Sequence, residues 1–330
     1  MPKITLMPSG INAAFPGGNS APPKRGTVRG LTQGSARRCK AFLMSIDAPK
    51  LDGVPITMTF TLRDIPSTSD EWDRLKRLLW DRLKRLGMIR CHFVTEWTKR
   101  GVPHLHAMGF FQEFYHWTMW SDGERLKLIS RVTSFDIVSH WCEIAAAYGA
   151  GPMGQHVRIE DGSINVAWFK YMSKHASRSA HHYQRQAELV PEGWQSTGRM
   201  WGKIGAGWPT HSETHEIDDW AFFALRRQVR RLRRSQALCE IRKGIEWGNL
   251  VQQKSGLSTL RYLRSHKRIV DPARSATVPI SEWVSSDVAM HILEGIYCNI
   301  EPRQTRREQW EQQSLARLSK HAAHNALNAL

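Results

Sequence analysis

The sequence predicts an α+β fold in which a mainly antiparallel sheet with flanking helices is followed by a helical C-terminal region. Residues 54–62, VPITMTFTL, are dominated by β-branched and apolar side chains, as expected of a strand. Residues 88–111 have the pattern of two strands joined by a tight turn. Leucines at helical spacing lie between these segments. This order of elements favours an antiparallel sheet with its helices packed on one side.

The predicted hairpin carries chemically active side chains on one face. Its arms are residues 88–97 and 102–111, and a Lys-Arg-Gly sequence supplies the turn. Because side chains alternate across a strand, His104 and His106 share a face. Glu96 lies on the first arm, and the turn folds its carboxylate back toward the two imidazoles. Two neutral imidazoles and a carboxylate suit a catalytic divalent ion.

The histidine pair alone is weak support for a metal site. The chain has 15 His in 330 residues, so roughly one His-x-His pair is expected by chance. Ordinary surface histidines on an edge strand remain the alternative. The surrounding sequence must therefore support the assignment.

Residues 67–86 are predicted to form an amphipathic helix that Gly87 ends. Hydroxyl side chains cap its start, and two acidic residues follow them in its first turn. Its apolar positions are Trp72, Leu75, Leu79, Leu83 and Leu86. The other face is basic, which usually means a solvated face, with DNA contact as the alternative.

Three more elements follow the hairpin. We predict a helix over residues 135–148, a short strand over 155–159 and a helix over 164–178. The last helix carries Tyr171, and Lys174 follows one helical turn later on the same face. An ammonium there would favour the ionised phenol or offset phosphate charge, although a solvent-exposed lysine has the same spacing.

Composition points to a nucleic-acid partner. The formal net charge is +17, and 14 Trp accompany the basic residues, which indicates a polyanion and surfaces on which bases stack. No apolar run approaches about eighteen residues and no signal peptide is recognisable, so we expect a cytoplasmic protein with no membrane partner. The five Cys form no Cys-x-x-Cys pair, which argues against a zinc ribbon or a disulfide framework.

The chain is expected to have three parts. Residues 1–38 are rich in Gly, Pro, Ser and Arg, and we predict a flexible basic arm there. Residues 39–209 would form the domain that carries the chemistry. Residues 210–330 would form a helical region for DNA binding or self-association. Within residues 193–208 a Gly-x-x-x-Gly-Lys sequence departs from P-loop spacing, so we predict no nucleotide site.

Three short motifs in order resemble the HUH endonuclease superfamily, in particular rolling-circle replication initiators of small single-stranded DNA phages, viruses and plasmids. The motifs are Thr59-Phe60-Thr61-Leu62, His104-Leu105-His106 and Tyr171 to Lys174. The resemblance covers residues 54–205. Their order and spacing support it more than any single motif does.

The resemblance implies a metal-dependent DNA endonuclease and strand transferase. Tyr171 would attack a phosphodiester and remain joined to the 5′-phosphate, leaving a free 3′-hydroxyl primer. Mg²⁺ or Mn²⁺ would bind Glu96, His104 and His106. Some members carry a second tyrosine one turn after the first, where this chain has His175, so a one-tyrosine form is expected. His175 would then transfer a proton, or have no role.

The resemblance also implies the partners. Thr59, Thr61 and Arg178 would contact DNA, which would include single-stranded DNA and an origin hairpin or duplex. A host helicase and DNA polymerase in a bacterial cytoplasm would extend the primer. The 193–208 segment would supply a closing strand and a loop that faces DNA.

Two other functions remain open. A non-catalytic replication protein would bind DNA through the same fold without cutting it. A relaxase or transposase of the same superfamily would cut DNA, but relaxases usually place the tyrosine before the histidine pair. Single-domain transposases with one tyrosine after the pair tend to be much shorter.

Overall fold

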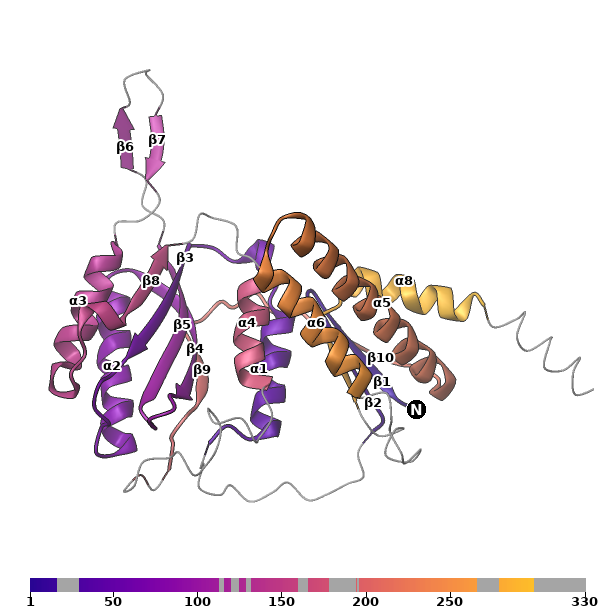
Figure 1. Cartoon of the computed structure of the whole chain (residues 1–330), viewed down its shortest axis with the longest axis horizontal. Helices are drawn as coiled ribbons and strands as arrows, with labels where there is room; N and C mark the ends of the chain where they lie inside the picture. Colours follow the sequence, from indigo (N-terminus) through magenta and orange to yellow (C-terminus); the bar gives the residue numbers. More distant parts are fainter. Residues whose placement is uncertain are drawn as a thin grey trace, which may run out of the picture. The chain divides into compact units, whose positions relative to one another are not determined.

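The computed structural model describes residues 1–16, 30–112, 116–119, 125–128, 132–159, 166–177, 194, 196–265 and 279–299. The chain divides into two compact units (Figure 1). The central unit comprises Met7–Ser9 and Asn19–Ser212, and the terminal unit comprises Met1–Leu6, Gly10–Gly18 and Glu213–Leu330. Both contain an antiparallel sheet and helices, so the α+β prediction is confirmed. No described helix is both long and apolar enough to span a bilayer.

The central unit is built on a five-stranded antiparallel sheet. Its strand order is β8 (His156–Ile159), β3 (Val54–Thr61), β5 (Pro103–Phe111), β4 (Met88–Trp97) and β9 (Trp201–Ile204). The predicted strands and the closing strand therefore form one sheet. The hairpin arms β4 and β5 occupy its centre, so the histidine pair does not lie on an edge strand.

Helices cover both faces of this sheet (Figure 1). On one face lie α2 (Ser69–Arg85) and α3 (Ser134–Ile144), and on the other lie α1 (Gln33–Ser45) and α4 (Val166–Ser177). The prediction of helices on one side is thus wrong. The physical reason is that β4 is buried at nine of its ten positions, so its two faces both need a cover.

An aromatic core fills the space between the sheet and the first helix pair. Trp141 of α3 packs edge-on against Trp72 of α2, with ring centroids 6.0 Å apart, and lies 5.1 Å from the ring of Phe60 on β3. All three side chains are fully buried. The side chain of Thr68 caps α2 by accepting a hydrogen bond from Glu71 N–H, as the hydroxyl-rich start predicts. Gly87 then adopts a φ of +92° where the chain turns into β4.

Helix α1 anchors the opposite face through a buried pair. Cys39 Sγ lies 3.5 Å from Nε2 of His92 on β4, and the Phe42 ring stacks on that imidazole at 5.9 Å. Burial lowers the pKa of His92 to about 3, so His92 is neutral at physiological pH. It therefore acts as a core residue.

Shorter elements complete the central unit. Strands β6 (His116–Met119) and β7 (Arg125–Leu128) pair with each other. Three elements are one-turn 3₁₀ helices: η1 (Ala48–Lys50), η2 (Ala146–Tyr148) and η3 (Pro152–Gly154). The helix predicted over residues 135–148 is thus α3 followed by η2. Gly149 ends it with a φ of +65°.

The terminal unit joins both ends of the chain in one sheet. The strand order is β10 (Glu213–Glu216), β1 (Lys3–Met7), β2 (Gly10–Ala14) and β11 (Ile280–Glu282). The expectation of a flexible arm over residues 1–38 is therefore wrong for residues 3–14, and residues 33–38 belong to α1. Ile4 and Ile11 are fully buried, and they share a core with helix residues from the other end of the chain. Residues 17–29 lie outside the described residues.

The other described elements of the terminal unit are helices, as predicted. They are α5 (Asp219–Glu246), α6 (Leu250–Ser265) and α8 (Ser286–Tyr297). Helices α5 and α6 pack closely, because a Cβ atom at Gly256 would lie 2.6 Å from the carbonyl oxygen of Ala237. We expected the boundary after residue 209, and the two units divide after Ser212.

Candidate active site

The register of the central strands groups the predicted metal ligands on one face. On β5, His104 lies opposite Glu96 of β4, and His106 lies opposite Val94 of the same strand. Directly opposed residues of an antiparallel pair share a face. The sequence argument for Glu96 thus places it correctly beside the histidine pair, on the face that α1 and α4 cover.

Contacts fix His106 more tightly than the strand register alone. Its Nδ1 lies 3.1 Å from the Thr59 hydroxyl, within hydrogen-bonding distance. Its Nε2 lies 3.7 Å from Oε2 of Glu96, which is too long for a direct hydrogen bond. The His104 and His106 rings are nearly perpendicular, with centroids 4.5 Å apart. His106 and Glu96 are only 6% and 3% exposed, so both side chains are held inside the fold.

Helix α4 brings Tyr171 to the same place. The phenol ring meets the His106 ring edge to face, with centroids 6.1 Å apart and an interplanar angle of 87°. Phe169 and Met172 are buried and dock the helix, which packs against α1 and β4. Tyr171 itself is 41% exposed. The nucleophile candidate is therefore both close to the histidine pair and accessible to a large substrate.

A neighbouring aromatic that the sequence analysis did not identify also shapes the site. The Trp168 ring lies 5.3 Å from the Tyr171 ring at an angle of 34°. The two residues are three apart on α4, so they face the same side of the helix. That i, i+3 spacing is the signal in the sequence that could have identified Trp168. Trp168 limits the orientations open to the phenol.

The other predicted site residues divide into two groups. Thr61 lies opposite His104, but its hydroxyl donates to Gly154 O at 2.7 Å and its N–H donates to Gln155 Oε1 at 2.8 Å. These bonds hold β3 against the turn before β8. Lys174 and His175 lie in α4, and their side chains fall outside the described residues, as does all of Arg178.

The donor set is chemically suited to a divalent ion, although the part of the chain that the structure describes contains no group of three His, Cys, Asp or Glu side chains arranged to hold one. Protein ligands lie about 2.0–2.2 Å from a small divalent ion, so two donors on one ion lie up to about 4.4 Å apart. The 3.7 Å between His106 Nε2 and Glu96 Oε2 is within that limit. The Thr59 contact at Nδ1 also leaves Nε2 directed at the carboxylate, as a ligating imidazole requires.

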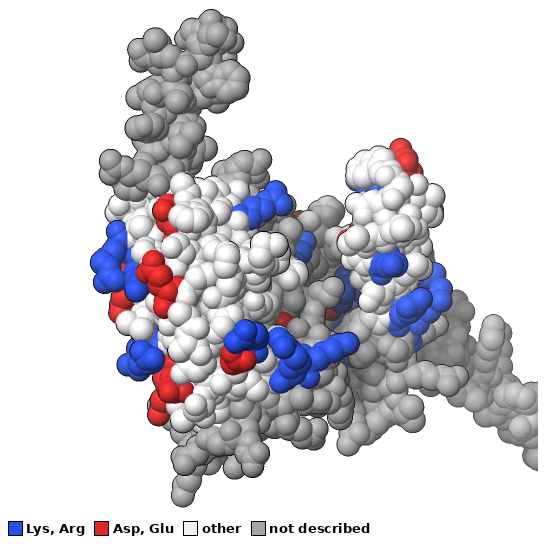
Figure 2. Space-filling model, turned by 60° about the vertical axis from the view of Figure 1, so that its left-hand side comes forward, with Lys and Arg blue, Asp and Glu red and all other residues white. Residues whose placement is uncertain are grey.

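The basic face of α2 lies on the opposite side of the sheet and is partly neutralised. Arg82 pairs with Glu143 of α3, and Lys84 lies 3.4 Å from Asp81. Figure 2 shows acidic and basic side chains interspersed on the central unit in this view. The arrangement favours the interpretation of α2 as a solvated face.

Three proteins are similar to this chain along most of its length. A protein of Xylella fastidiosa strain 9a5c, named as a replication protein, is 39% identical over 308 residues, which cover 88% of this chain and 94% of the relative. The replication-associated protein G2P of Pseudomonas phage Pf3 is 39% identical over 290 residues, covering 86% and 91%. A protein of X. fastidiosa strain Temecula1, also named as a replication protein, is 38% identical over 300 residues, covering 86% and 100%. No family model matches the chain, and no solved structure does.

Proposed function

Since the chain belongs to the family of replication proteins that includes G2P of Pseudomonas phage Pf3, we propose that it initiates rolling-circle replication by nicking single-stranded origin DNA. The observation that carries the proposal is the contact between Tyr171 and His106. Those residues come from a helix and a strand far apart in the sequence, yet their rings meet at 6.1 Å. The motif order and this contact support membership of the HUH endonuclease superfamily.

Tyr171 is the nucleophile in this proposal. Its phenolic oxygen attacks the scissile phosphorus, so a P–O bond to Tyr171 forms as the bond to the 3′-oxygen breaks. The phenol gives up its proton to a base, and the departing 3′-oxygen takes one up. The products are a 5′-phosphotyrosine and a free 3′-hydroxyl. Attack of a 3′-hydroxyl on the phosphotyrosine reverses the step, so rejoining requires no ATP.

Glu96, His104 and His106 are the residues that would hold a divalent ion, Mg²⁺ or Mn²⁺. When bound, such an ion would offset negative charge on the scissile phosphate. Glu96 and His106 are buried, and hydrogen bonding positions His106. Thr59 fixes the ring orientation of His106, so we assign it primarily to supporting that imidazole. Thr61 supports the strand end beside His104, and any DNA contact of either threonine is secondary.

The functional test is formation of a covalent adduct. The protein is incubated with single-stranded origin oligonucleotides and Mn²⁺, denatured, and examined for DNA that migrates with the polypeptide. Peptide mapping should find the DNA on Tyr171. DNA binding without any adduct would instead support the non-catalytic alternative. An adduct together with insertion of the strand into unrelated targets would support a transposase.

We assign proton transfer to His175, one turn after Tyr171 on α4, and contact with substrate phosphates to Lys174 and Arg178. Imidazole titrates near neutral pH, and proton transfer typically contributes about 10²–10⁴-fold. His175→Ala is therefore expected to slow cleavage by about 10²-fold, while His156→Ala on β8 should not. Cleavage by His175→Ala at the wild-type rate from about pH 6 to 8 would remove this role.

We assign the terminal unit to recognition of an origin hairpin or duplex, with self-association as a second role. The support is the charge of α5, which bears Arg226, Arg227, Arg230, Arg231, Arg233 and Arg234. Ionic contacts of this kind provide most sequence-independent DNA affinity. A host helicase and polymerase would then extend the 3′-hydroxyl in the bacterial cytoplasm.

A fragment of residues 19–212 tests this division of labour. We expect it to cut single-stranded oligonucleotides at a rate comparable to the whole chain, because Glu96, the histidine pair and Tyr171 all lie within it. Its affinity for duplex origin DNA should fall at least about tenfold. Circular dichroism and thermal unfolding establish that the fragment is folded. A folded fragment that cannot cut a single strand would contradict the assignment.

A further inference from the structure

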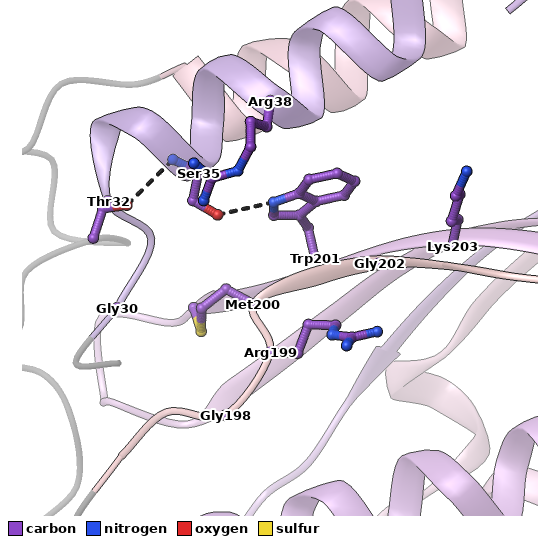
Figure 3. Close-up of a pocket in the computed structure, with 10 residues that line it drawn as sticks. All are labelled: Gly30, Thr32, Ser35, Arg38, Gly198, Arg199, Met200, Trp201, Gly202 and Lys203. Atoms are coloured by element: carbon purple, nitrogen blue, oxygen red, sulfur yellow. Dashed lines mark hydrogen bonds between the residues drawn. The ribbon is translucent and has the colours of Figure 1, made fainter. Parts of the chain in front are cut away.

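A pocket of about 450 Å³ opens between the N-terminal half of α1 and the edge strand β9 (Figure 3). Its lining residues from the start of α1 are Gly30, Thr32, Ser35 and Arg38, and those from β9 and the segment before it are Gly198, Arg199, Met200, Trp201, Gly202 and Lys203. We call it the α1–β9 pocket. Gly198, Gly202 and Lys203 are the Gly-x-x-x-Gly-Lys sequence that lacks P-loop spacing. The sequence analysis predicted no P-loop nucleotide site there, but it expected the 193–208 segment to face DNA.

One hydrogen bond joins the two walls of the pocket, and a second caps the start of α1. The indole N–H of Trp201 donates to Ser35 Oγ at 2.9 Å, and Thr32 accepts from Ser35 N–H at 3.2 Å (Figure 3). Gly198 has a φ of +61°, and a Cβ atom there would lie 2.7 Å from an oxygen of Asp73. The pocket therefore has a defined backbone shape before any ligand enters.

The lining is cationic and contains no acidic residue. Arg38, Arg199 and Lys203 are all exposed, and none of them forms an ion pair with another described residue. Arg38 and Lys203 lie on the α1 side of β9, whereas the Arg199 side chain lies on the other side of that strand (Figure 3). The indole of Trp201 adds an aromatic surface between Arg38 and Lys203, and the Lys203 ammonium lies 4.8 Å from the ring centroid of Phe42. Cations beside an aromatic surface suit a ligand that carries both a phosphate and a planar base.

The sheet register connects this pocket to the candidate active site. Val94 of β4 lies opposite His106 on one side and opposite Trp201 on the other. Trp201, Val94 and His106 therefore form one cross-strand row on the same face of the sheet. Adjacent strands are about 4.8 Å apart, so the backbones of Trp201 and His106 are about 10 Å apart. A single strand lying across the histidine pair would reach the pocket within a few nucleotides.

We infer that the α1–β9 pocket binds a nucleotide of the DNA single strand next to the cleaved phosphodiester, with Arg38 and Lys203 on its phosphates. The inference rests on the proposed function for the identity of the strand. Its geometry rests on the lining residues and the register. The pocket would thus fix the position of the strand relative to Tyr171.

Binding measurements without cleavage test the inference separately from the nicking chemistry. The full chain with Tyr171→Phe is titrated with a fluorescent single-stranded origin oligonucleotide over a range of salt concentrations. A second protein adds Arg38→Gln and Lys203→Gln. Each phosphate contact contributes about 0.7 to the slope of log K against log salt for single strands. Loss of two contacts should lower the slope by about 1.4 and raise Kd at least about fivefold.

The matched control is a double variant with the same change in net charge, Arg77→Gln and Arg85→Gln. These exposed residues of α2 are on the opposite face of the sheet. The control should bind much like the Tyr171→Phe parent, and all three proteins should unfold at similar temperatures. Equal salt slopes for the two double variants would overturn the inference. This result would leave the adduct assay unaffected.

Replacing one phosphate at a time by an uncharged methylphosphonate locates the contact along the strand. In the Tyr171→Phe parent, binding should weaken only when the methylphosphonate occupies one of a few adjacent positions. The pocket variant should lose that position dependence, because the partner cations are gone. Deoxynucleoside monophosphate is the probe for a free nucleotide ligand. If it binds the parent as tightly as the oligonucleotide does, the pocket takes free nucleotides and the inference is wrong.

Discussion

Tyr171→Phe is expected to abolish the covalent adduct and to reduce cleavage of single-stranded DNA by at least about 10³-fold, since loss of a nucleophile is among the largest single effects on an enzyme. The substitution removes one oxygen and keeps the ring. The contacts of that ring with His106 and Trp168 should therefore persist. Affinity for the oligonucleotide and thermal stability should stay close to those of the wild type.

Tyr148→Phe is a suitable control, because Tyr148 belongs to the α2 and α3 side of the sheet. It should form the adduct at the wild-type rate. Gel analysis under denaturing conditions, followed by peptide mapping, distinguishes the outcomes. Full cleavage by Tyr171→Phe, or an adduct mapped to Tyr183, would refute the assignment of the nucleophile.

The hairpin could be predicted from the sequence because its determinants are local. Alternation puts His104 and His106 on one face, and a short turn decides which residue of the first arm lies opposite them. The register places Glu96 opposite His104 as a result. What alternation could not provide is the closer approach of Glu96 to His106, which depends on side-chain rotamers.

The position of Tyr171 beside the histidine pair could not be predicted from local sequence. No periodicity relates α4 to β5, and the spacing between them allows many arrangements. Only the resemblance to a family implied that Tyr171 and the histidine pair belong together. In the structure, the buried side chains of Phe169 and Met172 determine which side of α4 faces the protein. Tyr171 lies at the margin of that side, which explains its partial exposure.

The N-terminal strands could not be predicted because their partners are distant. Each of β1 and β2 has five residues, too short for alternation to stand out beside Gly and Pro. Lys3 pairs with Glu216, and Ile280 pairs with Ala13, so more than half of the chain separates the partners. Such pairings are determined by burial of Ile4 and Ile11 against α5 and not by local sequence.

His106→Ala and His104→Ala are expected to reduce cleavage by at least about 10²-fold each, because a bound divalent ion contributes several kcal/mol to transition-state stabilisation and about 1.4 kcal/mol corresponds to tenfold. Chelation of divalent ions with EDTA should abolish cleavage by the wild-type protein, and Mg²⁺ or Mn²⁺ should restore it. Glu96→Gln keeps the size of a side chain that is only 3% exposed. This variant should also lose cleavage activity, because it lacks the carboxylate ligand of the divalent ion.

Calorimetric titration with Mn²⁺ separates loss of a ligand from loss of structure. His104 is less buried than His106, so His104→Ala should stay folded while its affinity for Mn²⁺ falls. Thr59→Val removes the hydroxyl at His106 Nδ1, and supporting groups of this kind typically contribute about 10–100-fold to metal affinity. His156→Ala is the control, because His156 shares the cross-strand row of His106 but lies two strands away. The metal site is refuted if folded His104→Ala and Thr59→Val both bind Mn²⁺ like the wild type, or if cleavage survives EDTA. In that case the hydroxyl of Thr59 serves only to hold the sheet.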